Sequence, residues 1–81
     1  MKVRAQFFAQ LRDVTGASET TFELSDGATV ADLLAKIYDQ FPALGSWDKS
    51  ILIGAGVDFV EKQHVLKPND EIAIMPPVQG G

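Results

Sequence analysis

The residues with the clearest capacity for chemistry stand at the end of the chain, which reads Pro76-Pro77-Val78-Gln79-Gly80-Gly81. Proline has a fixed φ and no backbone N–H, so the two prolines stop sheet pairing and favour a stiff, extended segment. The two glycines have no Cβ and can pass through a channel too narrow for other residues. This pattern predicts that the carboxylate of Gly81 is presented to the active site of a partner protein.

A terminal carboxylate resists nucleophiles until its oxygen becomes a good leaving group, and ATP can achieve this by forming an acyl-adenylate. Sulfur can then displace AMP and leave a thiocarboxylate at Gly81. Val78 is an isolated apolar group that can anchor in a partner, and we include Gln79 and Gly80 in that contact. A frayed, functionless end is the alternative, but the prolines and the fold pattern favour the reactive tail.

No other residues in the sequence form a recognisable catalytic or metal site. His64 is the only histidine and the chain has no cysteine, so the sequence indicates no disulfide, thiolate metal site or catalytic triad. The Gly54-x-Gly56 segment lacks a third glycine and a long following helix, so it predicts a hairpin turn and not a phosphate loop. We expect this chain to bind no metal and no cofactor of its own.

Length and charge narrow the classes of partner. The 81 residues fit one domain, and the formal net charge of −4 opposes binding to nucleic acid, which needs clustered Lys and Arg. No segment approaches the ~20 apolar residues that span a bilayer, and the first predicted strand follows Met1 without a secretory pattern. We expect a cytoplasmic protein that contacts other proteins, with no nucleic acid and no membrane.

The elements that must position the tail begin with two strands and a helix. Residues 2–8 alternate between apolar and polar positions, which predicts a strand with Phe8 on its polar face. Residues 9–14 predict a short helical turn and residues 20–24 a second strand that forms a hairpin with the first. Thr29 can then cap a helix with Asp32 at its third position, and Pro42 ends it. This helix has an apolar stripe that should pack across one face of a sheet: Val30, Leu33, Leu34, Ile37, Tyr38 and Phe41.

The second half of the chain predicts only short strands. Residues 51–53 and 57–60 flank the turn at Gly54-Ala55-Gly56, and residues 71–75 follow a turn at 67–70. This order predicts an α+β roll in which a mixed sheet packs against one main helix. Ubiquitin-like domains have this order, although other small α+β folds share it. We expect residues 1–75 to form the domain and residues 76–81 an extended, functional C-terminal tail.

Three segments carry a more specific resemblance: Phe7-Phe8-Ala9-Gln10-Leu11-Arg12, Asn69-Asp70-Glu71-Ile72-Ala73 and the tail from Pro76. They resemble the small sulfur-carrier subunits of molybdopterin synthase, the MoaD/ThiS-like family, over essentially the whole chain and in the same order. The resemblance implies a ubiquitin-like β-grasp roll. Thiamine-pathway sulfur carriers share the double glycine but generally lack the paired prolines.

The resemblance also implies partners and a reaction cycle. An E1-like adenylating enzyme would use ATP to activate Gly81, and a sulfur donor protein would convert it to a thiocarboxylate. The large catalytic subunit of molybdopterin synthase would then accept the tail, and sulfur would pass to the pterin precursor in molybdenum cofactor biosynthesis. On this interpretation the chain has no complete active site of its own.

We expect partners to contact an exposed apolar patch beside the tail, formed by Phe8, Phe59 and Met75. Arg12 matches a position that contacts partners in the family. Met75 stands where an aromatic residue is common in relatives, and Gly54-Ala55-Gly56 stands where they often have an Asn, so the partner surface departs from the family pattern. Three alternatives remain: a carrier for thiamine or tRNA thiolation, a ubiquitin-like protein modifier, and a binding module whose tail never reacts.

Overall fold

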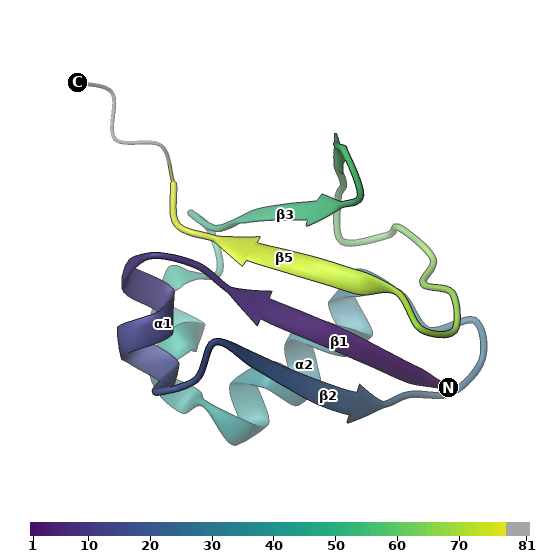
Figure 1. Cartoon of the computed structure of the whole chain (residues 1–81), viewed down its shortest axis with the longest axis horizontal. Helices are drawn as coiled ribbons and strands as arrows, with labels where there is room; N and C mark the ends of the chain where they lie inside the picture. Colours follow the sequence, from purple (N-terminus) through teal and green to yellow (C-terminus); the bar gives the residue numbers. More distant parts are fainter. Residues whose placement is uncertain (78–81) are drawn as a thin grey trace.

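One mixed sheet and one long helix form the body of the molecule (Figure 1). The structure is a computed structural model and describes residues 1–77. The strands are β1 (Lys2–Phe7), β2 (Glu19–Glu23), β3 (Leu52–Ala55), β4 (Asp58–Phe59) and β5 (Glu71–Met75). The helices are α1 (Gln10–Thr15), α2 (Val30–Gln40) and the 3₁₀ helix η1 (Pro42–Trp47). The predicted α+β class is therefore confirmed.

The strand order is β2-β1-β5-β3-β4, with the first and last strands of the chain side by side. β1 pairs antiparallel with β2 and parallel with β5, while β5 pairs antiparallel with β3. Because β1 and β5 are parallel, their carboxyl ends lie at the same end of the sheet (Figure 1). The chain therefore leaves the fold after Met75 next to the place where β1 ends.

α2 begins at the predicted cap. The Oγ1 of Thr29 accepts a hydrogen bond from the backbone N–H of Asp32 at 3.4 Å, and the backbone N–H of Thr29 donates to Oδ2 of Asp32 at 2.9 Å. This reciprocal arrangement satisfies two N–H groups that the helix cannot pair internally. α2 ends at Gln40, and Pro42 starts the 3₁₀ helix, which the sequence pattern did not predict.

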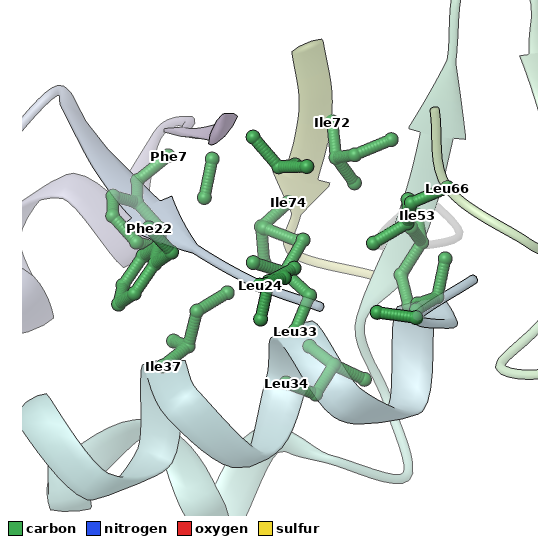
Figure 2. Close-up of a cluster of buried hydrophobic side chains, with 14 of the residues drawn as sticks. Phe7, Phe22, Leu24, Leu33, Leu34, Ile37, Ile53, Leu66, Ile72 and Ile74 are labelled. Atoms are coloured by element: carbon green, nitrogen blue, oxygen red, sulfur yellow. The ribbon is translucent and has the colours of Figure 1, made fainter. Parts of the chain in front are cut away.

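The core lies between α2 and the inner face of the sheet (Figure 2). The predicted helical stripe is buried at its first four positions, whereas Tyr38 and Phe41 are only partly buried. Within residues 1–77 no polar or charged residue is fully buried. None of the helices in this part of the chain has the length and apolar character of a membrane-spanning helix. The central buried residues are Phe7, Phe22, Leu24, Leu33, Leu34, Ile37, Ile53, Leu66, Ile72 and Ile74.

The β3–β4 hairpin corrects the predicted turn. Gly54 and Ala55 belong to β3 and pair with β5, so the expectation that they form the turn was wrong. The turn is Gly56-Val57, and Gly56 has the positive φ of 64° that favours glycine. The absence of a side chain at Gly54 makes room for Met75, because a Cβ at Gly54 would lie only 3.2 Å from Cε of Met75.

Candidate functional site: the open face of the sheet and the end of β5

The face of the sheet opposite α2 is divided into a polar half and an apolar half. On the polar half, Arg4 pairs with Glu19 (Nε to Oε2, 3.3 Å) and with Glu71 (Nη1 to Oε2, 3.5 Å). Gln6 donates from Nε2 to Oε1 of Glu71 at 3.2 Å. These side chains cross from β2 over β1 to the start of β5.

The apolar half lies on β5, β3 and β4. The register pairs Leu52 with Met75 and Gly54 with Phe59, and directly paired residues share one face of a sheet. We call Phe8, Leu52, Phe59 and Met75 the apolar patch. It lies beside the end of β5, on the same face as the polar half.

Phe8 joins this patch although it follows the last residue of β1. Its backbone N–H donates to the carbonyl of Ile74 at 3.2 Å, which extends the β1–β5 pairing by one residue and places Phe8 beside Met75. The next residue, Ala9, has a φ of 51° and turns the chain into α1. Phe8 remains 39% exposed, while Phe59 on the edge strand is 72% exposed.

Met75 is the flexible member of the patch. Its Cε lies over Gly54, whose missing side chain leaves room for the thioether chain against β3. Methionine has three rotatable bonds and a polarisable sulfur, so it can adjust its shape to a partner surface. Met75 therefore provides an adaptable apolar group at this place.

Sheet pairing stops at Met75, which is the last β5 residue paired with β3. Pro76 and Pro77 follow directly, belong to no helix or strand and are partly buried. Two residues without an N–H cannot continue the β5 ladder, as the sequence predicted. The other predicted tail residues, Val78, Gln79, Gly80 and Gly81, lie outside the described residues.

Arg12 lies outside the apolar patch. Arg12 is exposed on α1, which packs at the end of the sheet where β5 also ends (Figure 1). Phe8, Phe59 and Met75 share the open face, whereas Arg12 lies on this neighbouring helix. A protein that covered this end of the sheet would reach both.

Leu52 belongs to the patch but was not among the predicted site residues. The signal for it was the alternation along β3, since Leu52 must face away from the buried Ile53. Its pairing with Met75 depends on a contact between residues 23 positions apart in the sequence, which no local pattern reveals. Within residues 1–77 no three His, Asp or Glu side chains are grouped so that they could hold a metal ion.

Comparison with known proteins agrees with this architecture. The chain matches the ThiS family over residues 5–81. The molybdopterin synthase sulfur carrier subunit of Chlamydomonas reinhardtii is 43% identical over 83 residues, covering 100% of both chains.

Two solved structures share the fold. Small archaeal modifier protein 1 (SAMP1) of Haloferax volcanii superposes with a TM-score of 0.89 at 27% identity over 100% of both chains. A complex of subunits 1 and 2 of molybdopterin-converting factor from Helicobacter pylori contains a chain with a TM-score of 0.70 at 23% identity over 100% of both chains. The predicted ubiquitin-like β-grasp fold is confirmed.

Proposed function

The chain belongs to the ThiS family, and from this premise we propose that it is the sulfur-carrier subunit of a molybdopterin synthase. The observation that carries the proposal is the 43% identity, over the whole of both chains, to a protein named as that subunit. The family match extends to Gly81, so it includes the residue to which we assign the chemistry.

The proposed chemistry takes place at the carboxylate of Gly81. A carboxylate oxygen attacks the α-phosphorus of ATP in an E1-like adenylating enzyme, and pyrophosphate leaves. A hydrosulfide-level sulfur delivered by a sulfur donor protein then attacks the acyl carbon, and AMP leaves with the bonding electron pair. The product is a thiocarboxylate, with one oxygen of Gly81 replaced by sulfur. ATP serves the activating enzyme in this scheme, and this chain binds no cofactor itself.

The apolar patch supports the proposed contact with a large catalytic subunit. Exposed aromatic residues and methionine are enriched in protein interfaces, where burying them removes apolar surface from water. Phe8 and Phe59 expose such groups beside Met75, the last residue before the prolines. We propose that the large subunit covers this patch and Arg12, and takes Val78, Gln79 and Gly80 into its active site. There the sulfur of the thiocarboxylate bonds to a carbon of the pterin precursor, and water then cleaves the bond between sulfur and the acyl carbon, which restores the carboxylate of Gly81. We place this cycle in the cytoplasm, where ATP is available.

Intact-mass measurement tests the first half of the cycle. We expect incubation with ATP, an adenylating enzyme and sulfide to add about 16 Da, because one sulfur replaces one oxygen. Leaving out ATP is the control and should give no gain. If a known carrier gains the mass with the same enzyme while this chain does not, the chain is a binding module whose tail does not react.

A protein modifier is the second candidate, favoured by the likeness to small archaeal modifier protein 1. A modifier would use the same acyl-adenylate, but a lysine amine of another protein would attack the acyl carbon and form an isopeptide bond. A mass adduct between this chain and a second protein would support that function. Conversion of the pterin precursor to molybdopterin by the charged chain and the large subunit would support the carrier, and separates it from carriers for thiamine or tRNA thiolation.

A further inference from the structure

β2 is an edge strand of the sheet. In residues 1–77 this strand pairs only with β1 and stands at the end of the strand order. Leu24 donates its N–H to the carbonyl of Met1 at 2.8 Å, and Ser18 accepts from the N–H of Phe7 at 2.8 Å, so both face β1. Because hydrogen bonds alternate along an antiparallel strand, Glu19, Thr21 and Glu23 direct their backbone N–H and C=O groups outward. Such a row is a template for a further strand.

The side chains of Glu19, Thr21 and Glu23 determine which side chains an added strand should have. Thr21 pairs with the exposed Arg4, so Glu19, Thr21 and Glu23 all lie on the open face. The Glu19 and Glu23 side chains are 49% and 69% exposed. Each has one cationic neighbour: Oε2 of Glu19 lies 3.3 Å from Nε of Arg4, and Oε2 of Glu23 lies 3.4 Å from the N-terminal amine.

The surface next to this edge is also acidic. A hollow of about 900 Å³ lies between the segment that follows β2 and the outer side of α2. Its charged lining comprises one cation, Lys36, and four carboxylates: Glu23, Asp26, Asp32 and Asp39. A cationic segment lying along β2 would therefore meet negative charge beyond the strand as well as along it.

A second copy of this chain is a poor occupant of the edge. If two β2 strands paired antiparallel about Thr21, Glu19 of each would stand opposite Glu23 of the other. Like charges directly opposite each other in neighbouring strands are destabilising. The same charges that repel a second copy attract lysine or arginine at these places.

We propose that the edge of β2 binds an extended segment of another protein by strand addition. The segment carries Lys or Arg at two positions four residues apart, with a β-branched residue midway. Because Glu19 and Glu23 are symmetric about Thr21, the same pattern fits a parallel or an antiparallel segment. β1 and β5 lie between this edge and β3, the strand that carries Leu52 of the apolar patch. This contact does not depend on the function proposed for Gly81.

Nuclear magnetic resonance titration of the ¹⁵N-labelled full chain tests the proposal with the capped peptide Lys-Val-Thr-Val-Lys. We expect the amide signals of Glu19, Thr21 and Glu23, which face outward, to shift more than those of Thr20 and Phe22, which face β1. The capped peptide Glu-Val-Thr-Val-Glu is the matched probe and should leave these signals in place. Equal shifts with both peptides, or shifts confined to the apolar patch, would overturn the proposal.

Charge variants of the edge complete the test. Glu19→Gln combined with Glu23→Gln should weaken binding of the lysine peptide about fivefold, because two charge pairs are lost. Asp58→Asn combined with Glu61→Gln removes two exposed carboxylates from β4 and the residues after it, at the other end of the strand order, and should leave the affinity unchanged. Thr21→Pro should abolish binding, since it removes an outward N–H from an edge position. Equal weakening by the two double variants, or concentration-dependent dimers of the unliganded chain, would reject this occupant.

Discussion

Phe59 is the more exposed of the two aromatic side chains in the patch. We therefore expect it to contribute to the free energy of binding a partner and little to the free energy of unfolding. Phe59→Ala should lower the affinity for the large subunit about tenfold, as truncation of an aromatic anchor commonly does. Its effect on the unfolding free energy should be small, because 72% of the residue is already in water. Isothermal titration calorimetry with the large subunit measures the first quantity and chemical denaturation the second.

Val57 provides the matched control for Phe59. It is 100% exposed in the neighbouring turn but lies outside the paired residues of β3 and β4. Val57→Ala should therefore leave the affinity within about twofold. Equal losses from the two substitutions would show that the patch, as defined by its strand register, is not the contact surface.

Asp48 contacts two side chains from different parts of the chain. Its Oδ1 accepts a hydrogen bond from the hydroxyl of Tyr38 at 2.5 Å, and its Oδ2 pairs with Nζ of Lys62 at 2.6 Å. The hydrogen bond from Lys62, followed by that from Tyr38, lowers the pKa of Asp48 below its usual value. Partial burial, with the Asp48 hydrogen bond, raises the pKa of Tyr38, so the hydroxyl remains a donor at neutral pH. The contact ties α2, the segment after η1 and the loop before β5 together.

We expect Asp48→Asn to lower the unfolding free energy by about 1 kcal/mol at neutral pH, since it removes a charge from a partly exposed pair. A carboxyl whose pKa is lower in the folded state stabilises above its unfolded pKa of about 3.9 and loses this effect as pH falls through the folded pKa. The difference between wild type and variant should therefore shrink below about pH 4. Urea denaturation at several pH values measures it. A difference that stays constant to pH 2 would contradict the assignment.

At the scale of elements, the cap of α2 at Thr29 is predicted by the sequence, and its removal should destabilise the fold. Thr29→Ala removes the side-chain acceptor for the N–H of Asp32 and should lower the unfolding free energy by about 1 kcal/mol. Thr29→Ser keeps the hydroxyl and should cost much less. Thermal denaturation compares the two, and an equal loss from both would show that the hydroxyl does not stabilise the cap.

One further segment, the loop before β5, covers this same helix end. The N–H groups of Val30 and Ala31 donate to the carbonyls of His64 and Lys62, each at 2.9 Å. Together with the capping pair, these bonds satisfy the first donors of α2 from residues about 30 positions away. The loop before β5 is therefore fixed on α2, which positions the start of the last strand.

At the scale of the whole molecule, the fold and the proposed reaction depend on different parts of the chain. Within residues 1–77 the buried hydrophobic residues run from Val3 to Ile74, so every described core residue precedes the prolines. Deletion of Gly81 should leave the unfolding free energy unchanged within about 0.5 kcal/mol. It should abolish thiocarboxylate formation, because the remaining carboxylate falls short by about 3.5 Å, the reach of one extended residue.

Circular dichroism and intact mass measure the two effects of this deletion on the same sample. The wild-type chain, treated in parallel, is the control for the activating enzyme. A deletion variant that folds and still gains sulfur would contradict the assignment of the chemistry to Gly81.

The sequence by itself determined the elements whose signals are local. The period of α2, its cap at Thr29, the boundary at Pro42 and the strand at Glu71–Met75 are each set by neighbouring residues, and the structure confirms them. The family resemblance rested likewise on short segments read in order. The roles of the tail residues stay predictions, since they concern Val78 to Gly81 and the proteins that receive them.

The tertiary structure alone decided which residues from distant parts of the chain lie next to one another. Gly54 reads as a turn residue in the sequence, but it pairs with Ala73 of β5 and Phe59 of β4 and is therefore part of β3. Leu52 joined the patch and Arg12 was placed outside it through the pairing of β3 with β5 and the packing of α1. The free edge of β2 likewise follows from the strand order. Such contacts join residues far apart in the chain, and their energy depends on packing that no local pattern contains.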